Sequence, residues 1–137
     1  FATPHGICID RRSGKERVAI CDRAHHTLQF LDLNGRHQET LTGYGLPANL
    51  DTLGKLMLVP ELHARITLLN EKNQVVARLG DDVENVVKQK KVNRGKANTW
   101  KAGHFVHPHD ACFGPNGDIY VAEWVQSGRI SKLRKLS

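Results

Sequence analysis

The sequence has no long run of apolar residues. None of its stretches approaches the roughly 18 consecutive apolar residues that a transmembrane helix requires, so we expect no membrane span and no membrane partner. No signal peptide is visible, because the first residues pass directly into a repeated motif. The chain begins at Phe1 and not at a methionine, so we expect a trimmed or partial product. Its compartment stays open, and export or a periplasmic location would require a signal peptide on a longer precursor.

Cysteine is scarce, with three residues in a chain of 137. Three cysteines do not indicate a disulfide framework. Cys8 and Cys112 occupy equivalent positions in two similar segments, where small buried residues are common. One bridge between Cys8 and Cys21, on a neighbouring strand, stays an open alternative. The cysteine content therefore leaves the redox compartment undecided.

Familiar catalytic and cofactor motifs are missing as well. There is no Ser-His-Asp arrangement, no glycine loop that would hold a phosphate, no zinc-knuckle spacing and no Rossmann fingerprint. The net charge is +6, from 20 basic and 14 acidic residues, but the basic ones are scattered except at 88–91 and 132–135. Scattered charge is typical of solvated surfaces, so we expect no nucleic-acid partner.

The sequence does contain a repeated strand-turn-strand unit. Residues 107–123 predict a short strand, a Pro-Asn-Gly-Asp turn and a second strand, because Asn-Gly beside alternating apolar residues is a strong hairpin signal. Residues 4–22 open in the same way. The two copies share Pro-His, a cysteine three residues after the histidine, and an acid that closes the second strand. A weaker copy runs over residues 47–61.

Each copy continues into a third strand, and the first two copies continue into a fourth. A period of about forty residues with four short strands is typical of propeller blades. We therefore predict an all-β fold with a blade at 1–43, a blade at 44–81, an insertion loop at 82–104 and an incomplete blade at 105–137. The insertion is expected to leave the sheet surface as a long loop with at most a short helix.

The first repeat reads Pro-His-Gly-Ile, then Ala-Ile-Cys-Asp-Arg-Ala-His-His-Thr-Leu-Gln-Phe-Leu-Asp, then Asn-Gly. In this spacing it resembles the NHL repeat of six-bladed β-propellers. The third repeat shares the likeness well, the second loosely and the insertion not at all. The resemblance implies half of a six-bladed β-propeller built from three NHL-type blades. Function varies across that family, so the fold alone does not assign one.

Propeller geometry brings the repeated residues together. The first two strands of a blade are antiparallel, so His5 is expected near Asp22, and His109 near Glu123. First strands line the central channel of a propeller, so both histidines converge at one mouth, where imidazole and carboxylate are the usual ligands of zinc. His107 lies two residues before His109 and shares its side of an extended segment, so it joins the candidate zinc site. The alternative is that each histidine only bonds a backbone carbonyl and stabilises its blade.

A more distant resemblance, to the peptidyl-α-hydroxyglycine α-amidating lyase propeller, implies roles for particular residues. That lyase takes zinc-ligand histidines from alternate blades, which His5 and His109 match. The resemblance implies a catalytic arginine just after the acid that ends a second strand, here Arg23. The position of a catalytic tyrosine corresponds most nearly to His63. The match fails elsewhere, because His107 replaces a methionine and a further catalytic arginine would fall in a blade that this chain lacks.

Three functions of different classes remain open. We expect a propeller module for binding, with a zinc site at the channel mouth and a protein or peptide ligand. The first alternative is a zinc-dependent lyase, although this fragment alone is not expected to be an enzyme. The second is a metal-free propeller that binds partner proteins through its outer loops. Arg23 suits an anionic ligand such as a carboxylate, unless it forms a salt bridge to Asp22 or to a neighbouring blade.

Assembly follows from the number of repeats. Three blades make half of a ring, and the open ends of that half expose unpaired strand groups and apolar faces. We therefore expect a homodimer in which two copies pair about a two-fold axis and complete a six-bladed ring.

Overall fold

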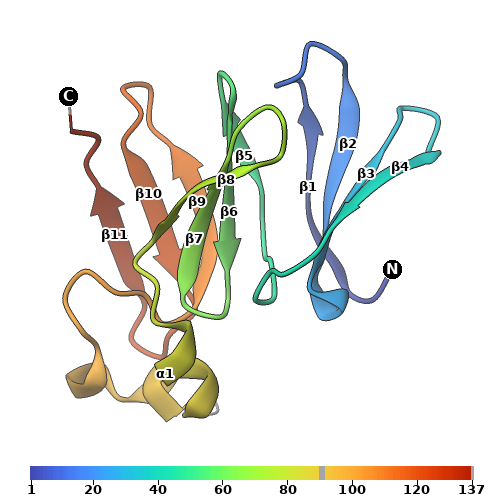
Figure 1. Cartoon of the computed structure of the whole chain (residues 1–137). Helices are drawn as coiled ribbons and strands as arrows, with labels where there is room; N and C mark the ends of the chain where they lie inside the picture. The colour runs from blue at the N-terminus through green and yellow to red at the C-terminus, as the bar shows by residue number, and fades with distance from the viewer. Residues whose placement is uncertain (90–91, 137) are drawn as a thin grey trace.

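The computed structural model describes residues 1–89 and 92–136 of the chain. Over these described residues the protein is all-β, with three antiparallel sheets that stand side by side and one short α-helix, α1 (Val83–Lys88) (Figure 1). Part of the basic stretch at 88–91, namely residues 90 and 91, lies outside the described residues. No helix in the described part of the chain is long and apolar enough to cross a membrane.

Each sheet is a meander of consecutive strands. The first sheet contains β1 (Pro4–Asp10), β2 (Arg17–Asp22), β3 (Thr27–Leu31) and β4 (His37–Leu41). The second sheet contains β5 (Asp51–Leu53), β6 (Leu56–Glu61), β7 (Arg65–Leu69) and β8 (Val75–Leu79). The third sheet contains β9 (Pro108–Phe113), β10 (Ile119–Glu123) and β11 (Arg129–Leu133), and among the described residues it has no fourth strand.

Glycine makes the first hairpin of the first and third sheets turn in the same way. Gly14 has φ 82° and donates its N–H to the Arg11 carbonyl at 3.1 Å. Gly117 has φ 85° and donates to the Gly114 carbonyl at 2.9 Å. Residues with a Cβ rarely adopt this backbone conformation. The Ser-Gly and Asn-Gly signals of the two repeats therefore give equivalent turns.

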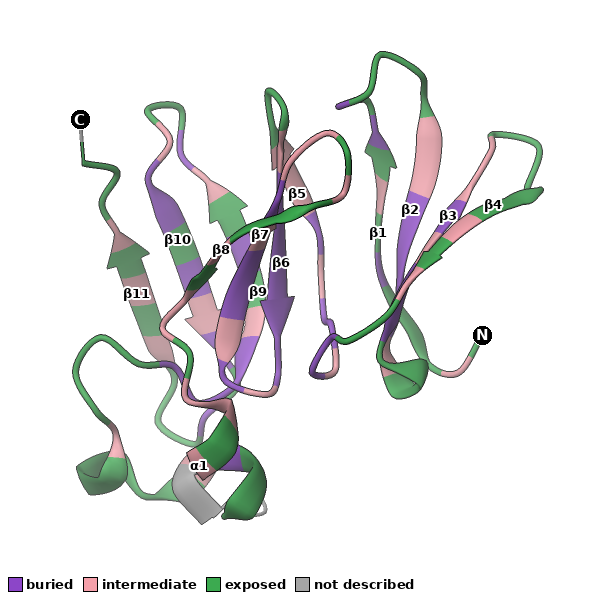
Figure 2. Ribbon diagram, viewed as in Figure 1, coloured by how far each residue is buried: buried purple, intermediate pink, exposed green. Residues whose placement is uncertain are grey.

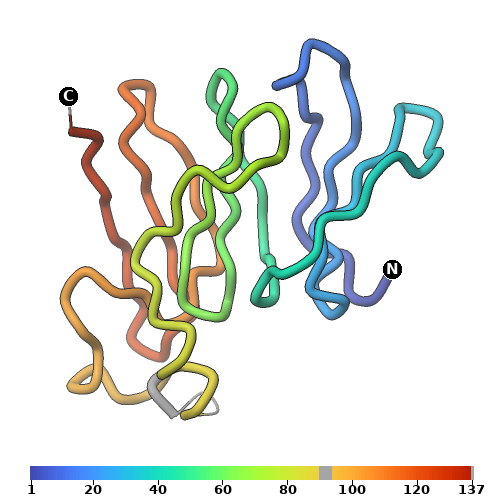
Figure 3. The backbone as a smooth tube through the Cα atoms, viewed as in Figure 1, coloured from blue at the N-terminus to red at the C-terminus, as the bar shows by residue number. Residues whose placement is uncertain are grey.

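Two apolar clusters of the core pack on the two faces of the second sheet, and β6 in that sheet is buried along most of its length (Figure 2). Side chains alternate between the two faces of a strand. Met57 and Val59 therefore face the first sheet, while Leu58 between them faces the third. The outer faces of the first and third sheets lack such a neighbour, so Ile7 is 65% exposed and Ile130 is 74% exposed. The two termini lie on opposite sides of the molecule (Figure 3).

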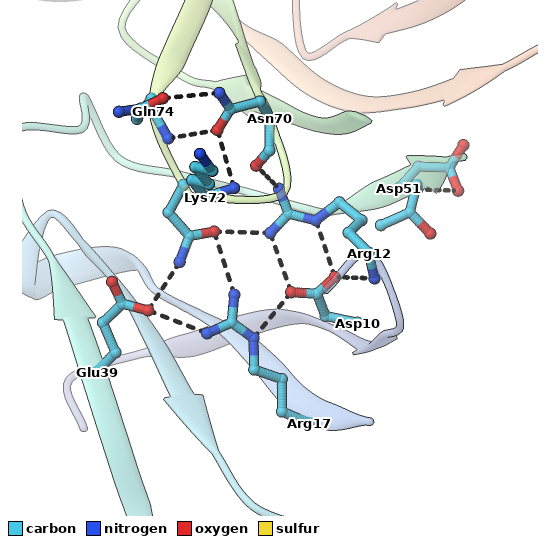
Figure 4. A network of polar contacts seen from close by, with 10 residues as sticks. Asp10, Arg12, Arg17, Glu39, Asp51, Asn70, Lys72 and Gln74 are labelled. Carbon is cyan, nitrogen blue, oxygen red and sulfur yellow. Dashed lines mark hydrogen bonds and ion pairs between the residues drawn. The ribbon is translucent and has the colours of Figure 1, made fainter. Parts of the chain in front are cut away.

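A buried ion-pair network ties the first sheet to the second at the end where β1 finishes (Figure 4). The Asp10 carboxylate accepts hydrogen bonds from Arg12 Nε at 2.8 Å and from Arg17 Nε at 3.0 Å. Arg12 also donates to the Asn70 carbonyl, and its Nη2 donates to Asn73 Oδ1 at 2.8 Å. The network joins the β1–β2 turn to the β7–β8 turn. It lies at the end of the sheets opposite to the expected histidine site.

The three cysteines are free, so the open alternative of a Cys8–Cys21 bridge is not realised. The β1–β2 register pairs Cys8 with Ala19 and not with Cys21. Burial raises the pKa of the Cys8 thiol to about 11. Cys112 was expected in a buried position but is exposed, because it lies on the outer face of the third sheet.

Candidate functional site

The acids that close the second strands of the three sheets all turn inward, away from the expected site. Asp22, Glu61 and Glu123 are buried. The Asp22 carboxylate accepts the N–H of Ala2 at 2.6 Å, and Glu123 accepts the N–H of Val106 at 2.7 Å. Each of these acids lies at the end of a second strand and accepts a backbone N–H from the segment that precedes the first strand of the same sheet.

Ion pairs complete the hydrogen bonding of two of these acids. Glu61 accepts from Gly45 N–H and from Arg65 Nε, the latter at 2.9 Å. Glu123 accepts from Arg129 Nε. Two of the three acids, Asp22 and Glu123, are the carboxylates that were expected near His5 and His109, and both are hydrogen-bonded within the protein. The observed acids therefore stabilise the sheets, and the expected cluster of histidines and carboxylates is reduced to its histidines.

A cavity of about 580 Å³ opens at the end of the sheets where β2, β6 and β10 finish. Segments that flank the strands of all three sheets, together with α1, form its walls, and no carboxylate of the described residues lines it. The polar lining residues are Thr3, Arg23, His63, His107 and His109. The apolar ones are Ala24, Leu46, Leu62, Val86, Val87 and Trp124. The volume is in the range of sites that hold small molecules.

Arg23 begins a 3₁₀ turn (Arg23–His25) directly after β2. The sequence left open a salt bridge between Arg23 and Asp22, but Asp22 Oδ2 instead contacts His25 Nδ1 at 2.8 Å. Among the described residues, no carboxylate forms an ion pair with Arg23. The cavity therefore contains a positive charge that the described protein groups do not neutralise.

His5 and His109 lie together beside the larger cavity. Their ring centroids are 5.0 Å apart, in an edge-on arrangement. Both line a second cavity of about 190 Å³, and His109 lines the larger one as well. His5 Nδ1 lies 2.5 Å from the Ala48 carbonyl oxygen. A carbonyl only accepts, so Nδ1 is the donor in this contact, and Nε2 is the ring nitrogen left for a metal, as in metal-bound histidines.

His107 is separated from that pair. Its ring is buried, its Nδ1 lies 2.6 Å from the Leu62 carbonyl oxygen, and it lines only the larger cavity. In the described part of the chain, no three His, Cys, Asp or Glu residues are grouped to hold a metal ion. The structure therefore brings His5 and His109 together but does not join His107 to them. Two imidazoles are fewer than the three protein ligands typical of catalytic zinc.

His63 lines the larger cavity, between the first and second sheets. Its Cβ packs against Gly45, where an added Cβ would lie only 2.5 Å away. Burial lowers the pKa of His63, and the neighbouring His26 lowers it further, although Glu61 acts in the opposite direction. Its ring is therefore neutral near pH 7.

The pKa of His109 is lowered in the same direction. Burial is the main cause, and the charges of His5 and Arg23 add to it. The cavity consequently combines a permanent cation with the imidazoles of His63 and His109, whose lowered pKa favours the neutral form at pH 7. These rings can donate to or accept from a ligand without adding positive charge.

The sequence did not predict the apolar wall of the cavity. Val86 and Val87 come from α1, inside the segment expected to be a loop without a constellation of its own. Leu46 and Leu62 precede and follow strands of the second sheet. No periodic pattern marks Val86 and Val87 as wall residues, because α1 has only six residues. Trp124, which directly follows β10, also lines the cavity.

The first strand of each sheet approaches the first strand of the next sheet, or the segment just before it, as in a propeller-type fold. An added Cβ on Gly6, in β1, would lie 2.4 Å from Asn49 Cα, just before β5. The N–H of Phe113, in β9, donates to Asp51 Oδ2 in β5 at 2.7 Å. The strands that follow diverge from this line, as blades do (Figure 1).

Solved structures share this fold. A protein of unknown function from Bacteroides caccae matches 92% of this chain over 43% of its own length, with 16% identity and a TM-score of 0.65. Virginiamycin B lyase from Staphylococcus aureus matches 99% of this chain over 42% of its length, with 9% identity and a TM-score of 0.61. Glutaminyl cyclase from Myxococcus xanthus matches 96% over 54% of its length, with 12% identity and a TM-score of 0.57.

This chain therefore spans about half the length of those neighbours. Identities this low show the fold and not the activity. No family model and no curated protein matches the sequence.

Proposed function

We propose that the chain is half of a six-bladed ring of NHL-type blades and that it binds a small anionic ligand in the larger cavity. The observation that carries the proposal is Arg23, which lines a cavity without carboxylates and has no ion-pair partner among the described residues. A guanidinium offers planar, paired donors that match a carboxylate. Neutral His63 and His109 add hydrogen-bonding groups beside it.

Exchange of Arg23 tests the anion site. We expect calorimetric titration to show that Arg23→Gln binds hexanoate about 10–100-fold more weakly, because a hydrogen bond to a charged group contributes about 1.5–3 kcal/mol. The melting temperature should move by only a degree or two. Arg36→Gln is the matched control, since Arg36 is exposed and lies outside the cavity. Unchanged binding in Arg23→Gln, or a large loss of stability with binding intact, would contradict the proposal.

We propose a zinc site at His5 and His109 as a second property of the same mouth. Its support is the contact of His5 Nδ1 with the Ala48 carbonyl, which leaves Nε2 as the ring nitrogen for a metal. The pair needs ligands from outside this chain, and a second copy in a ring would bring another pair. His107 would be a ligand of this site only if assembly into the ring moves it next to His5 and His109.

Zinc uptake tests this site. Elemental analysis of zinc-soaked protein is expected to find bound zinc that disappears in a His5→Ala/His109→Ala double variant. His37→Ala is the control, because His37 is exposed and its ring contacts Thr40, far from the cavity lining. If the native chain takes up no zinc, or the double variant still binds it, the two histidines serve only the scaffold.

A lyase is the second candidate function. His63 lines the same cavity as Arg23, and its lowered pKa makes the neutral ring available to accept a proton near pH 7. Virginiamycin B lyase, one of the structural neighbours, is named for such an activity. Turnover that needs both Arg23 and His63 would favour this candidate. Binding of a protein or peptide with neither zinc nor a small carboxylate would favour the metal-free interaction propeller.

A further inference from the structure

We propose that the larger cavity selects carboxylates with an apolar body, and that Val87 in α1 and Trp124 after β10 determine this preference. The inference rests on the proposed anion site, because it assigns the remainder of the same ligand. The occupant we infer is a small amphipathic carboxylate. It would place its charged end at Arg23 and its apolar end against the wall formed by α1 and Trp124.

The apolar wall includes side chains that remain open to solvent within a concave site. Val87 is 48% exposed and Trp124 is 49% exposed, although both line the cavity. On the adjoining helix position, Val86 is buried and packs with Val106 and Val125. The core thus fixes α1 through Val86 and leaves Val87 facing the cavity. Exposed apolar surface of this kind in a pocket is a typical binding surface.

Trp124 is held in place by several contacts. The Arg94 guanidinium lies 3.1 Å from the centroid of its indole ring, and the His109 ring lies 6.1 Å away, edge-on. The N–H of Trp124 donates to the His107 carbonyl at 2.8 Å. The N–H of Gln126 donates to the Arg94 carbonyl at 2.9 Å, which anchors the insertion to the same turn. A ring fixed in this way provides contact area without loss of rotamer entropy on binding.

The fixed cation of the cavity and its exposed apolar side chains come from different elements, and His107 and His109 of the third sheet line the cavity as well. Thr3 and Arg23 come from the first sheet, whereas Val87 and Trp124 come from α1 and the third sheet. These elements lie on opposite sides of the second sheet (Figure 1). A ligand that satisfies both walls needs an anionic group at one end and an apolar body at the other. Acetate would meet only the first wall.

A series of straight-chain carboxylates tests this inference on the 137-residue chain. Titration calorimetry with acetate, butanoate and hexanoate is expected to show affinity rising about fourfold for each added methylene. Val87→Ser should flatten this increase, because it weakens the binding of hexanoate far more than the binding of acetate. Val87→Thr keeps the shape of the side chain, so its increase of affinity with chain length should lie between those of the native chain and Val87→Ser. It also tests the inference if the serine variant does not fold.

Val76→Ser provides the matched control. Val76 is 52% exposed, lies in β8 and does not line the cavity, so its replacement should leave the series unchanged. If the carboxylates bind through Arg23 but with equal affinity at all lengths, the apolar preference is wrong and the anion site stands. If none of them binds, the anion site itself fails. An increase with length that persists in both Val87 variants and in Trp124→Ala would also overturn the inference.

Discussion

The histidines show how one side chain combines two roles. The sequence left open whether His5 is a scaffold residue or a metal ligand, and its contact with the Ala48 carbonyl is compatible with both. Nδ1 fixes the ring to the segment before β5, while Nε2 is the ring nitrogen left for a metal. His107 makes the same kind of contact with Leu62, but in the other cavity. A bond to the backbone is therefore no argument against a ligand role.

Asp10 carries a prediction for stability at low pH. Burial alone would raise the pKa of Asp10, but hydrogen bonds from Arg12 and Arg17 hold it below its ordinary value. A carboxyl with a lowered folded-state pKa contributes stability above its unfolded-state pKa, about 4, and loses it as the pH falls through the folded-state value. We therefore expect the free energy of unfolding, from urea titration, to fall as the pH is lowered below about 4.

Substitution of Asp10 distinguishes its contribution to the pH dependence of stability from that of the other carboxyl groups. Asp10→Asn should lower the free energy of unfolding at pH 7 by about 3–5 kcal/mol, because it leaves buried Arg12 without its partner. It should also reduce the dependence on pH. Glu16→Gln is the control, since Glu16 pairs with Arg11 on the exposed turn, where an ion pair contributes about 0–1 kcal/mol. If the free energy of unfolding depends on pH in the same way in both variants, Asp10 does not stabilise the fold through Arg12 and Arg17.

At the scale of elements, close packing at one glycine determines where the first strands lie. Gly6 lets β1 approach the segment before β5, because any Cβ there would collide with the Asn49 backbone. This approach places the Ala48 carbonyl within reach of His5. Asn49 in turn donates to Asp110 Oδ1 at 2.5 Å, at the start of β9. The Pro-His-Gly signature thus contains both a site residue and the glycine that permits its position.

Helix α1 is the element whose role the sequence analysis did not assign. The segment was expected to be a loop with at most a short helix, and it contains α1 and two 3₁₀ turns (Val92–Gly95 and Ala97–Thr99). Six residues are too few for a periodic pattern to separate a core face from a cavity face. That division appears only where α1 packs against Val106 and Val125.

At the scale of the whole molecule, the first and third sheets are related by the repeat. Cys8 and Ala19 of the first sheet are covered by the second sheet, at least in part. The equivalent positions of the third sheet, Cys112 and Tyr120, are exposed, as is Ile130. The exposed face is therefore the one that the next blade covers elsewhere in the chain. Either a second copy or further blades of a longer chain would cover it in the same way.

We propose the second copy and expect a dimer. Light scattering at micromolar concentration should give about twice the chain mass of 15.3 kDa. Ile130→Asp, on the open face of the third sheet, should give a monomer because a charge there cannot be buried against the partner. Val75→Asp is the control, since Val75 is exposed in β8 of the second sheet, away from both open faces. A native chain that is a stable, soluble monomer would contradict the dimer.

The sequence by itself determined the strands, the hairpin turns and the approach of His5 to His109. These depend on the two-residue period of strands, on glycine in turns and on a spacing that repeats along the chain. Tertiary structure alone decided that Asp22, Glu61 and Glu123 bond their own sheets, and that α1 forms a wall of the cavity. Such outcomes depend on which way side chains point and on what packs beside them from distant parts of the chain. Local sequence does not encode those contacts, because they exist only once the sheets stand side by side.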